Sequence, residues 1–174
     1  EAWYFNAVMD LNNKGLMNGT GDGTNFSPNA QLTRGMAATV LYRMSGETTG
    51  VAAEAAKTFS DVAANQWYAA AVDWAADNNI VTGYQGKFNP NANITRQDLA
   101  TMLYRYAQFK KDDTSKTNDL ASFSDKGAVA SYANAAMQWA VGDGIISGRA
   151  GNKLAPRAQT SRAEFAAMVS RYLA

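Results

Sequence analysis

The chain has 174 residues, 47% of them hydrophobic, which is enough to bury a core as one domain or a compact array. It contains no cysteine and no histidine, which excludes disulfides, thiolate nucleophiles, histidine-based triads and the commonest zinc ligands. The formal net charge is +1 with acids and bases interleaved, and no apolar run approaches the length of a membrane span. We therefore expect no metal or cofactor, no nucleic-acid partner and no membrane insertion.

All three prolines lie in the same sequence context, which indicates a tandem repeat. Each is followed six residues later by an arginine, and a hydroxyl residue precedes that arginine. The prolines are Pro28, Pro90 and Pro156, and the pairs are Thr33-Arg34, Thr95-Arg96 and Ser161-Arg162. Near the start of each repeat lies an aromatic residue, followed sixteen residues later by a glycine. The aromatic residues are Trp3, Trp67 and Tyr132, spaced 64 and 65 residues apart, and the glycines are Gly19, Gly83 and Gly148.

Repeat one covers residues 1–46, and its apolar pattern predicts two helices. Val8, Leu11 and Leu16 have the spacing of a buried helix face, and Gly15 lies where a helix end favours a left-handed residue. Residues 21–24, Gly-Asp-Gly-Thr, lack the ligand number of a calcium or phosphate loop and are interpreted as a turn. After Thr33 a second apolar stripe contains Ala37, Val40, Leu41 and Met44.

Residues 47–58 are interpreted as a linker, in which 51–57 could form a short helix, and repeat two covers residues 59–109. It opens with Phe59-Ser60-Asp61, a lead-in that has no counterpart before Trp3, so we expect the chain to be a fragment cut at its front edge. A first helix is predicted over residues 67–79, ending at Asn79. Its stripe is Val72, Ala75, Ala76 and Ile80, and the second helix has Leu99, Met102, Leu103 and Tyr106.

Residues 110–122 form the second predicted linker, and repeat three covers residues 123–174. Its lead-in is Phe123-Ser124-Asp125, and its stripes are Met137, Ala140 and Ile145, then Phe165, Met168, Val169 and Tyr172. Three equivalent amphipathic helices can bury their stripes around a common axis. The predicted fold is therefore all-α, with three helix-loop-helix repeats in a pseudo-threefold arrangement around a central three-helix bundle.

The start of each second helix carries an unusual cation. The hydroxyl residue is a helix N-cap, and Glu164 could complete a capping box with Ser161, whereas the shorter Asp98 favours the helix dipole only. The arginine then occupies the first helical position, where the dipole is positive and amides are unpaired, so it contributes little to the fold by itself. An arginine at this position is favourable if an anion binds there, because the dipole, the amides and the guanidinium would all act on it.

These motifs resemble S-layer homology repeats, whose signature is an Ile-Thr-Arg-Ala-Glu string. Repeat two matches closely with Ile94-Thr95-Arg96-Gln97-Asp98, and repeat three reads Thr160-Ser161-Arg162-Ala163-Glu164. Repeat one departs from the string, with Leu32-Thr33-Arg34-Gly35-Met36. The resemblance extends over nearly the whole chain, because the aromatic residue, the glycine, the proline and the arginine recur in the same order in all three repeats.

The resemblance implies a cell-wall anchor of a bacterial surface protein. Such triplets hold proteins non-covalently on a secondary cell-wall polysaccharide, often one with pyruvate ketals, in grooves between repeats. The implied location is extracellular, at the cell wall or S-layer, and one chain would form a monomeric pseudo-trimer. The implied ligand contacts are Arg96, Arg34 and Arg162 with the neighbouring Thr95, Thr33 and Ser161, together with Trp67, Trp3, Tyr132, Asp61 and Asp125.

Each implied contact has a structural alternative. The arginines could be solvated charges or could pair with acids of a neighbouring repeat. The aromatic residues could anchor the first helix rather than stack on a sugar ring. Asp61 and Asp125 could cap the turn before the first helix rather than bind sugar hydroxyls.

Two other function classes compete with the anchor. A structural or protein–protein module for surface-layer assembly would not require the repeated arginine. A glycosidase would require a pair of carboxylates, and no acid pair recurs at one place in each repeat. We therefore expect a non-catalytic binding module.

Overall fold

The computed structural model describes residues 1–47 and 58–174. Over these residues the chain forms six α-helices and two short 3-10 helices, and no strand. The helices are α1 (Phe5–Asn13), α2 (Arg34–Ser45), α3 (Ala69–Asp77), α4 (Arg96–Lys110), α5 (Asn134–Gly142) and α6 (Arg162–Leu173), with η1 (Lys126–Ala128) and η2 (Ser131–Ala133) before α5. The all-α prediction is confirmed, while the short helix suggested at residues 51–57 lies outside the described residues.

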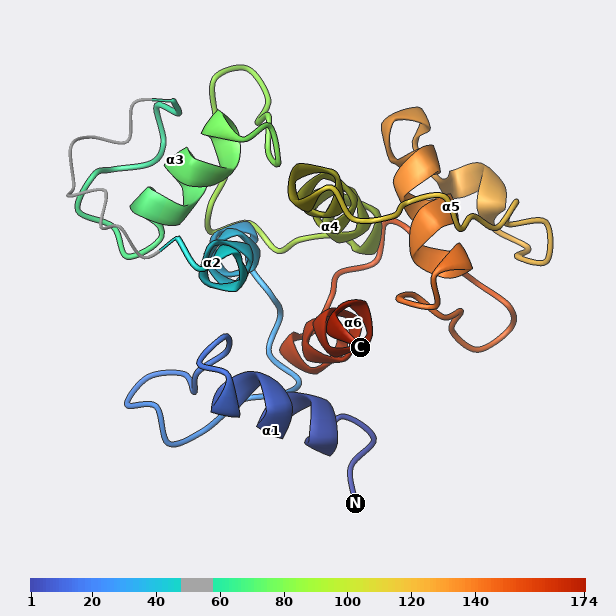
Figure 1. Ribbon diagram of the computed structural model, residues 1–174, viewed down its shortest axis with the longest axis horizontal. Coiled ribbons are helices and arrows are strands. Elements are labelled where there is room, and N and C mark those ends of the chain that lie inside the picture. Colours follow the sequence, from blue (N-terminus) through green and yellow to red (C-terminus); the bar gives the residue numbers. More distant parts are fainter. Residues whose placement is uncertain (48–57) are drawn as a thin grey trace.

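The second helices of the repeats, α2, α4 and α6, lie at the centre of the molecule, and α1, α3 and α5 lie around them (Figure 1). Helix α3 packs on α2, α5 packs on α4, and α1 packs on α6. Each outer helix therefore covers the central helix of the preceding repeat, and α1 closes the circle on the last one. The packing unit is thus offset from the sequence repeat, and the chain cannot be divided into three independent beads.

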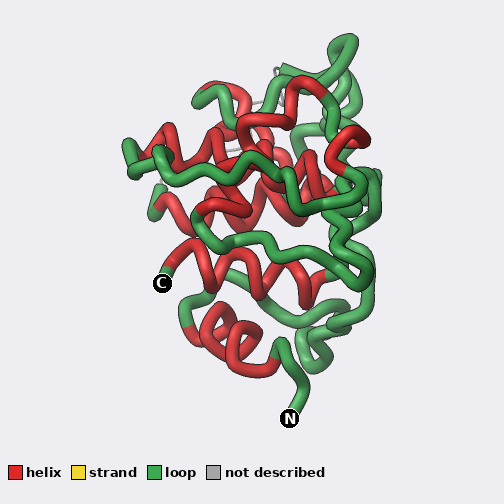
Figure 2. Tube along the Cα trace, turned by 90° about the vertical axis from the view of Figure 1, so that its right-hand side faces the viewer, coloured by secondary structure: helices red, strands yellow, loops and turns green. Residues whose placement is uncertain are grey.

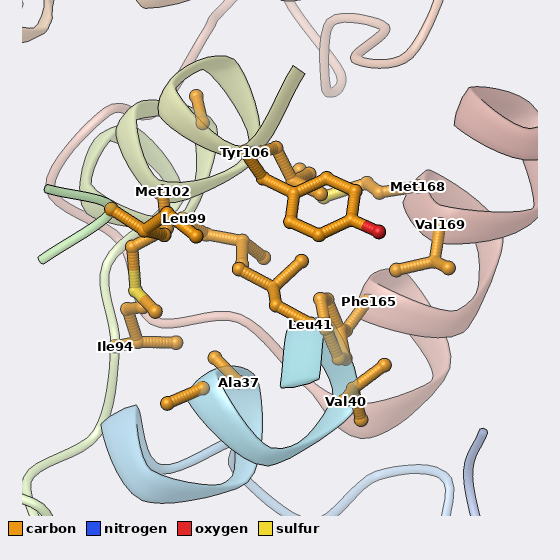
Figure 3. Packing of buried hydrophobic residues seen from close by; sticks show 14 of the residues in the cluster. Ala37, Val40, Leu41, Ile94, Leu99, Met102, Tyr106, Phe165, Met168 and Val169 are labelled. Carbon is orange, nitrogen blue, oxygen red and sulfur yellow. The ribbon is translucent and has the colours of Figure 1, made fainter. Parts of the chain in front are cut away.

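The predicted apolar stripes form the core. Leu41, Leu103 and Val169, which occupy one register in α2, α4 and α6, are fully buried. Side chains from all three central helices, among them Leu41, Tyr106 and Phe165, point toward one another in Figure 3. The core assignment is confirmed, and the threefold symmetry of the arrangement stays a prediction.

The outer helices end as their sequences predict, but they begin later. Gly15 and Gly144 have φ of +68° and +75°, and Asn79 has φ of +57°, so all three adopt the left-handed conformation. Helix α3 begins at Ala69 rather than at Trp67, because Trp67 lies in a turn and Tyr68 is the residue that caps the helix. The same offset occurs at Trp3 and Tyr4 before α1.

Three backbone hydrogen bonds link the repeats in a closed ring. The amide of Leu32 donates to the carbonyl of Thr160, Thr160 donates to Ile94, and Ile94 donates back to Leu32, at 2.8, 3.1 and 2.9 Å. All three residues are buried directly before the central helices. Figure 2 shows that the loops gather along one side of the molecule, while the helices fill the other.

The segment interpreted as the second linker is mostly exposed, but its later part packs on α5. The amide of Asn118 donates to the carbonyl of Gln138 in α5, and Leu120 is almost fully buried. A side chain at Gly142 of α5 would collide with the backbone of Thr117, so helix and segment are in close contact. In the described part of the chain, no helix has the length and apolar character needed to span a membrane.

Candidate functional site: three grooves between repeats

Each central helix begins with the predicted cap. The hydroxyls of Thr33 and Thr95 each accept a hydrogen bond at 3.2 Å from the amide three residues later, and that of Ser161 accepts one at 3.1 Å. The carboxylate of Glu164 also accepts from the amide of Ser161 at 2.9 Å, which completes the capping box. Asp98 does not reach back to Thr95 in this way, as its shorter side chain predicts.

The first two amides of each central helix are occupied, which corrects the expectation of a free anion site there. In α2 the amides of Arg34 and Gly35 donate to the carbonyls of Ala92 and Pro90 in repeat two, at 3.0 and 2.8 Å. Equivalent bonds join α4 to Ala158 and Pro156, and α6 to Ala30 and Pro28. The helix starts therefore hold the proline loop of the next repeat, and their amides are not available to an external anion.

The three arginine side chains reinforce the same contact. Nε of Arg34 donates to the carbonyl of Phe88, Nε of Arg96 to Leu154, and Nε of Arg162 to Phe26, at 2.8, 2.8 and 2.9 Å. Burial lowers the pKa of all three guanidinium groups, although arginine stays charged at neutral pH. The expectation that this arginine contributes little to the fold is therefore wrong, because each one ties two repeats together.

Each arginine also lines a groove between repeats, and the three grooves are built from equivalent parts. A groove contains the arginine of one repeat, the glycine loop and central helix of the next, and the opening aromatic residue of the third. The Arg34 groove has a volume of about 540 Å³, the Arg162 groove about 420 Å³ and the Arg96 groove about 210 Å³. The grooves therefore share one plan but differ in size.

The opening aromatic residues present their rings at the grooves. Trp3 lines the Arg96 groove, Trp67 the Arg162 groove and Tyr132 the Arg34 groove, and these side chains are 66%, 61% and 59% exposed. The adjacent Tyr68 is 4% exposed and meets Trp67 edge-to-face at 5.0 Å, so the tyrosine acts as the anchor of the helix. This geometry favours stacking on a ligand over a purely structural role for the tryptophan.

Tyr132 is tied to the helix that forms the floor of its groove. Its hydroxyl donates to Oδ1 of Asp98 at 2.5 Å and accepts from Nε2 of Gln97 at 3.3 Å. Burial and the neighbouring Asp98 carboxylate raise the pKa of Tyr132 to about 12. The ring is thus held at a fixed angle across the groove, and the phenol remains neutral at physiological pH.

Asp61 and Asp125 lie outside the residues that line the grooves. The two carboxylate oxygens of Asp61 accept from the amides of Phe88 and Asn89, both at 2.8 Å, and Asp125 binds the amides of Leu154 and Ala155 in the same way. Burial opposes the charge on both carboxyls, but the amides outweigh it and hold the pKa of Asp61 and of Asp125 below the usual value. A capping role is therefore favoured over binding of sugar hydroxyls. The position of the cap differs from the prediction, because each carboxylate caps the loop before the second helix of its repeat and not the turn before the first.

A second arginine recurs nine residues after the first and was missed in the sequence. Arg43, Arg105 and Arg171 line the Arg162, Arg34 and Arg96 grooves respectively. Nη1 of Arg43 donates to the carbonyl of Leu16, and Nη1 of Arg171 to that of Ile145. In the described part of the chain, Arg105 has neither a hydrogen bond nor an ion pair. The constant spacing of nine residues between the two arginines could have indicated this second site, but the second arginine lies outside the five-residue family signature.

The loop at residues 21–24 is an ordinary turn. Oδ1 of Asp22 accepts from the amide and the hydroxyl of Thr24, at 3.0 and 2.7 Å. Across residues 1–47 and 58–174, no three Asp or Glu side chains gather as a metal site would require. Gly21 lies at the edge of the Arg162 groove, so the turn shapes that groove.

Comparison with known proteins identifies the same three repeats. The S-layer homology domain family matches residues 1–38, 58–100 and 122–166. The chain is 31% identical to the Surface-layer 125 kDa protein of Lysinibacillus sphaericus over 95% of its own length and 14% of that protein. It is 28% identical to the Cellulosome-anchoring protein of Acetivibrio thermocellus over 85% of its length and 33% of that protein.

An enzyme is also among the similar proteins. The chain is 27% identical to an Endoglucanase of a Bacillus species over 99% of its own length and 18% of that protein. The chain thus spans a third or less of the length of these three curated relatives. Because the family matches all three predicted repeats, the chain belongs to the S-layer homology domain family and contains three copies of that domain.

Proposed function

We propose that the chain is a non-catalytic anchoring module that binds a secondary cell-wall polysaccharide in the grooves between its repeats. The observation that carries this proposal is the repeated construction of the grooves. Each one combines a buried or partly buried guanidinium, a second arginine and an exposed aromatic ring. A protein that serves only as a spacer needs none of these groups in triplicate.

The groove chemistry suits a sugar that carries a carboxylate. An aromatic ring presents an apolar face that a pyranose ring can cover, and arginine binds carboxylates through charge-assisted hydrogen bonds. A pyruvate ketal places a carboxylate directly on a sugar ring. A pyruvylated wall glycan would therefore use both parts of a groove at once, whereas a neutral glycan would use only the aromatic face.

The relatives support anchoring at the cell surface. Their names include a surface-layer protein, a cell surface glycoprotein and a cellulosome-anchoring protein. The three enzymes among them match this chain over 9–18% of their own lengths, which fits a module attached to a separate catalytic part. The same arrangement would place the present chain at the cell wall of its host.

A cell-wall pull-down tests the proposal. The chain is mixed with purified walls before and after mild acid treatment, which removes pyruvate ketals, and bound protein is measured in the pellet. We expect binding to untreated walls and a large loss after acid treatment. Equal binding to both preparations would exclude the ketal as the ligand, and a chain that stays in solution with both would favour the assembly module.

Matched alanine variants show whether the grooves are responsible. Trp67, Trp3 and Tyr132 are exposed groove residues, whereas Phe5 is a half-exposed aromatic residue of α1 outside every groove. We expect the triple variant Trp3→Ala, Trp67→Ala, Tyr132→Ala to lose wall binding while Phe5→Ala retains it. If both variants bound walls equally well, binding would have to occur elsewhere on the surface.

A further inference from the structure

The same guanidinium nitrogen faces a different group in each groove. Nη1 of Arg34 lies 3.8 Å from the carboxylate of Asp98, and Nη1 of Arg96 lies 3.6 Å from that of Glu164. Nη1 of Arg162 instead lies 4.0 Å from the sulfur of Met36. These three partners occupy one register, the third position of the central helix, so repeat one has a thioether where the other two repeats have an acid.

Arg162 is consequently a buried cation without a counter-charge. It is 6% exposed, and in the described part of the chain no carboxylate lies within ion-pairing distance of it. Its other partners are the carbonyls of Phe26 and Asn18 and the ring of Phe26, which solvate the charge but do not neutralise it. Buried charges in proteins are normally paired, so this site is incomplete without an anion.

The residues around Arg162 do not supply that anion. The groove is lined by a second arginine, Arg43, by Trp67 and by neutral residues, and it contains no acidic side chain. The Arg96 groove shows the opposite situation. There Glu164 also pairs with Arg149 at 2.5 Å, so an internal carboxylate already pairs with two of the three arginines that line this groove, and only Arg171 is left without an ion pair among the described residues.

We propose that the Arg162 groove is the primary site for the carboxylate of the wall glycan, and that Met36 leaves this groove open. In the other two grooves the acid at the same register competes with the ligand, least effectively in the wide Arg34 groove and most effectively in the narrow Arg96 groove. This inference rests on the proposed function and adds a ranking of the three grooves to it. The departure of repeat one from the family signature then improves binding in its groove rather than disabling it.

The ranking can be measured with the tryptophans of the chain. Trp67 reports on the Arg162 groove and Trp3 on the Arg96 groove, while Trp74 and Trp139 are buried in the core. The indole N–H signals are followed by NMR during titration with a methyl glucoside that carries a pyruvate ketal, and are assigned with Trp67→Phe and Trp3→Phe. We expect the Trp67 signal to shift at an about tenfold lower ligand concentration than the Trp3 signal.

Two substitutions test the role of the acid directly. Met36→Glu places a carboxylate beside Arg162 and should raise the ligand concentration at which the Trp67 signal shifts by about tenfold or more. Met36→Gln should raise that concentration less. Folding should not suffer in Met36→Glu, because the new glutamate can complete a capping box with Thr33. Glu164→Gln should have the opposite effect and lower the ligand concentration at which the Trp3 signal shifts. The side-chain oxygen of the glutamine can still accept the hydrogen bond from the amide of Ser161.

The outcomes separate this inference from the proposed function. If Trp3 responds before or together with Trp67, or if heat of binding appears without a Trp67 shift, the ranking is wrong but the anchoring function stands. An unchanged Trp67 response in Met36→Glu would also refute the ranking. If neither the ketal glucoside nor purified cell walls bind to the chain, the proposed function itself fails, and the ranking fails with it. The unsubstituted methyl glucoside serves as the control and should shift neither signal at the same concentration.

Discussion

Nε of Arg96 donates a hydrogen bond at 2.8 Å to the carbonyl oxygen of Leu154, 58 residues further along the chain. A second bond, from Nη2 to the carbonyl of Ser147 at 3.0 Å, joins the same guanidinium to the glycine loop of repeat three. This side chain therefore holds two repeats together at the Arg96 groove. Under the proposed function the same residue would serve both binding and folding, so a substitution here has to be tested for both.

Replacement of Arg96 by alanine should destabilise the protein. Two carbonyls would lose a charged donor, and we expect a loss of about 1.5–3 kcal/mol in the free energy of unfolding. Arg105→Ala is the matched control, because this arginine has no partner among the described residues, and it should change stability by less than about 0.5 kcal/mol. Urea unfolding of both variants provides the measurement. Equal unfolding midpoints would mean that the bonds of Arg96 contribute nothing net to the fold.

The core prediction concerns Leu103 of α4. This side chain is fully buried among the central helices, so Leu103→Ala should cost about 2–5 kcal/mol through lost burial and a residual cavity. Leu173→Ala is the control, because Leu173 ends α6 with 41% of its surface exposed, and it should cost less than about 1 kcal/mol. Thermal melting of both variants distinguishes them. A melting temperature unchanged by Leu103→Ala would disprove the packing of the stripe.

Acidification should destabilise the fold through Asp61 and Asp125. Their pKa values are lower in the folded chain than in the unfolded one, because the loop amides outweigh the effect of burial. The contribution of each carboxylate is fully present above the unfolded pKa, near 4, and is lost as the pH falls through the lower folded pKa. We therefore expect the melting temperature to drop below about pH 4.

The variant Asp61→Asn assigns part of this pH dependence. An asparagine can accept only one of the two amide hydrogen bonds, so the variant should melt lower than the parent at neutral pH and lose less stability on acidification. Asp10→Asn is the control, since Asp10 is a half-exposed helix residue whose carboxylate pairs with Lys14 at the surface. Parallel pH profiles for the parent and Asp61→Asn would show that the loop cap does not couple to folding.

A pair of glycines tests the close approach that shapes the Arg34 groove. A Cβ at Gly83, where φ is +63°, would lie 2.3 Å from the ring of Phe59 and 2.6 Å from the carbonyl of Lys87. At Gly86, where φ is +73°, a Cβ would meet nothing within 4 Å. Both alanine variants carry a backbone penalty of about 1 kcal/mol, and Gly83→Ala should lose about 1–3 kcal/mol more. Calorimetric melting would show whether the two losses differ, and equal losses would contradict the contact.

The sequence predicted the elements whose causes are local. Apolar residues three and four apart indicated the buried faces of the helices, and the hydroxyl residues at positions 33, 95 and 161 predicted the N-caps. Both features depend on residues within one or two helical turns. The complete capping box at Ser161 and the incomplete one at Thr95 followed in the same way from the length of a single side chain.

The partners of the helix starts could not be predicted from the sequence. The repeat shows that an arginine follows each cap, but the cyclic packing decides that Arg34 meets Phe88 and that Arg162 meets Phe26. The amides expected to be free for a ligand are paired for the same reason. Such contacts join residues 54 and 136 positions apart, and no local periodicity specifies them.

By itself, the sequence determined that this protein is a helical triplet of one repeat with a cation at three equivalent places. Only the tertiary structure decided that these places differ, because the side chain that faces each guanidinium from another repeat decides whether its charge is paired with an acid. Met36 is merely a departure from the signature in the sequence. In the folded chain Met36 lies beside the buried Arg162 and leaves this guanidinium without a counter-charge. The strength of a charge interaction depends on distance and burial, which only the folded chain defines.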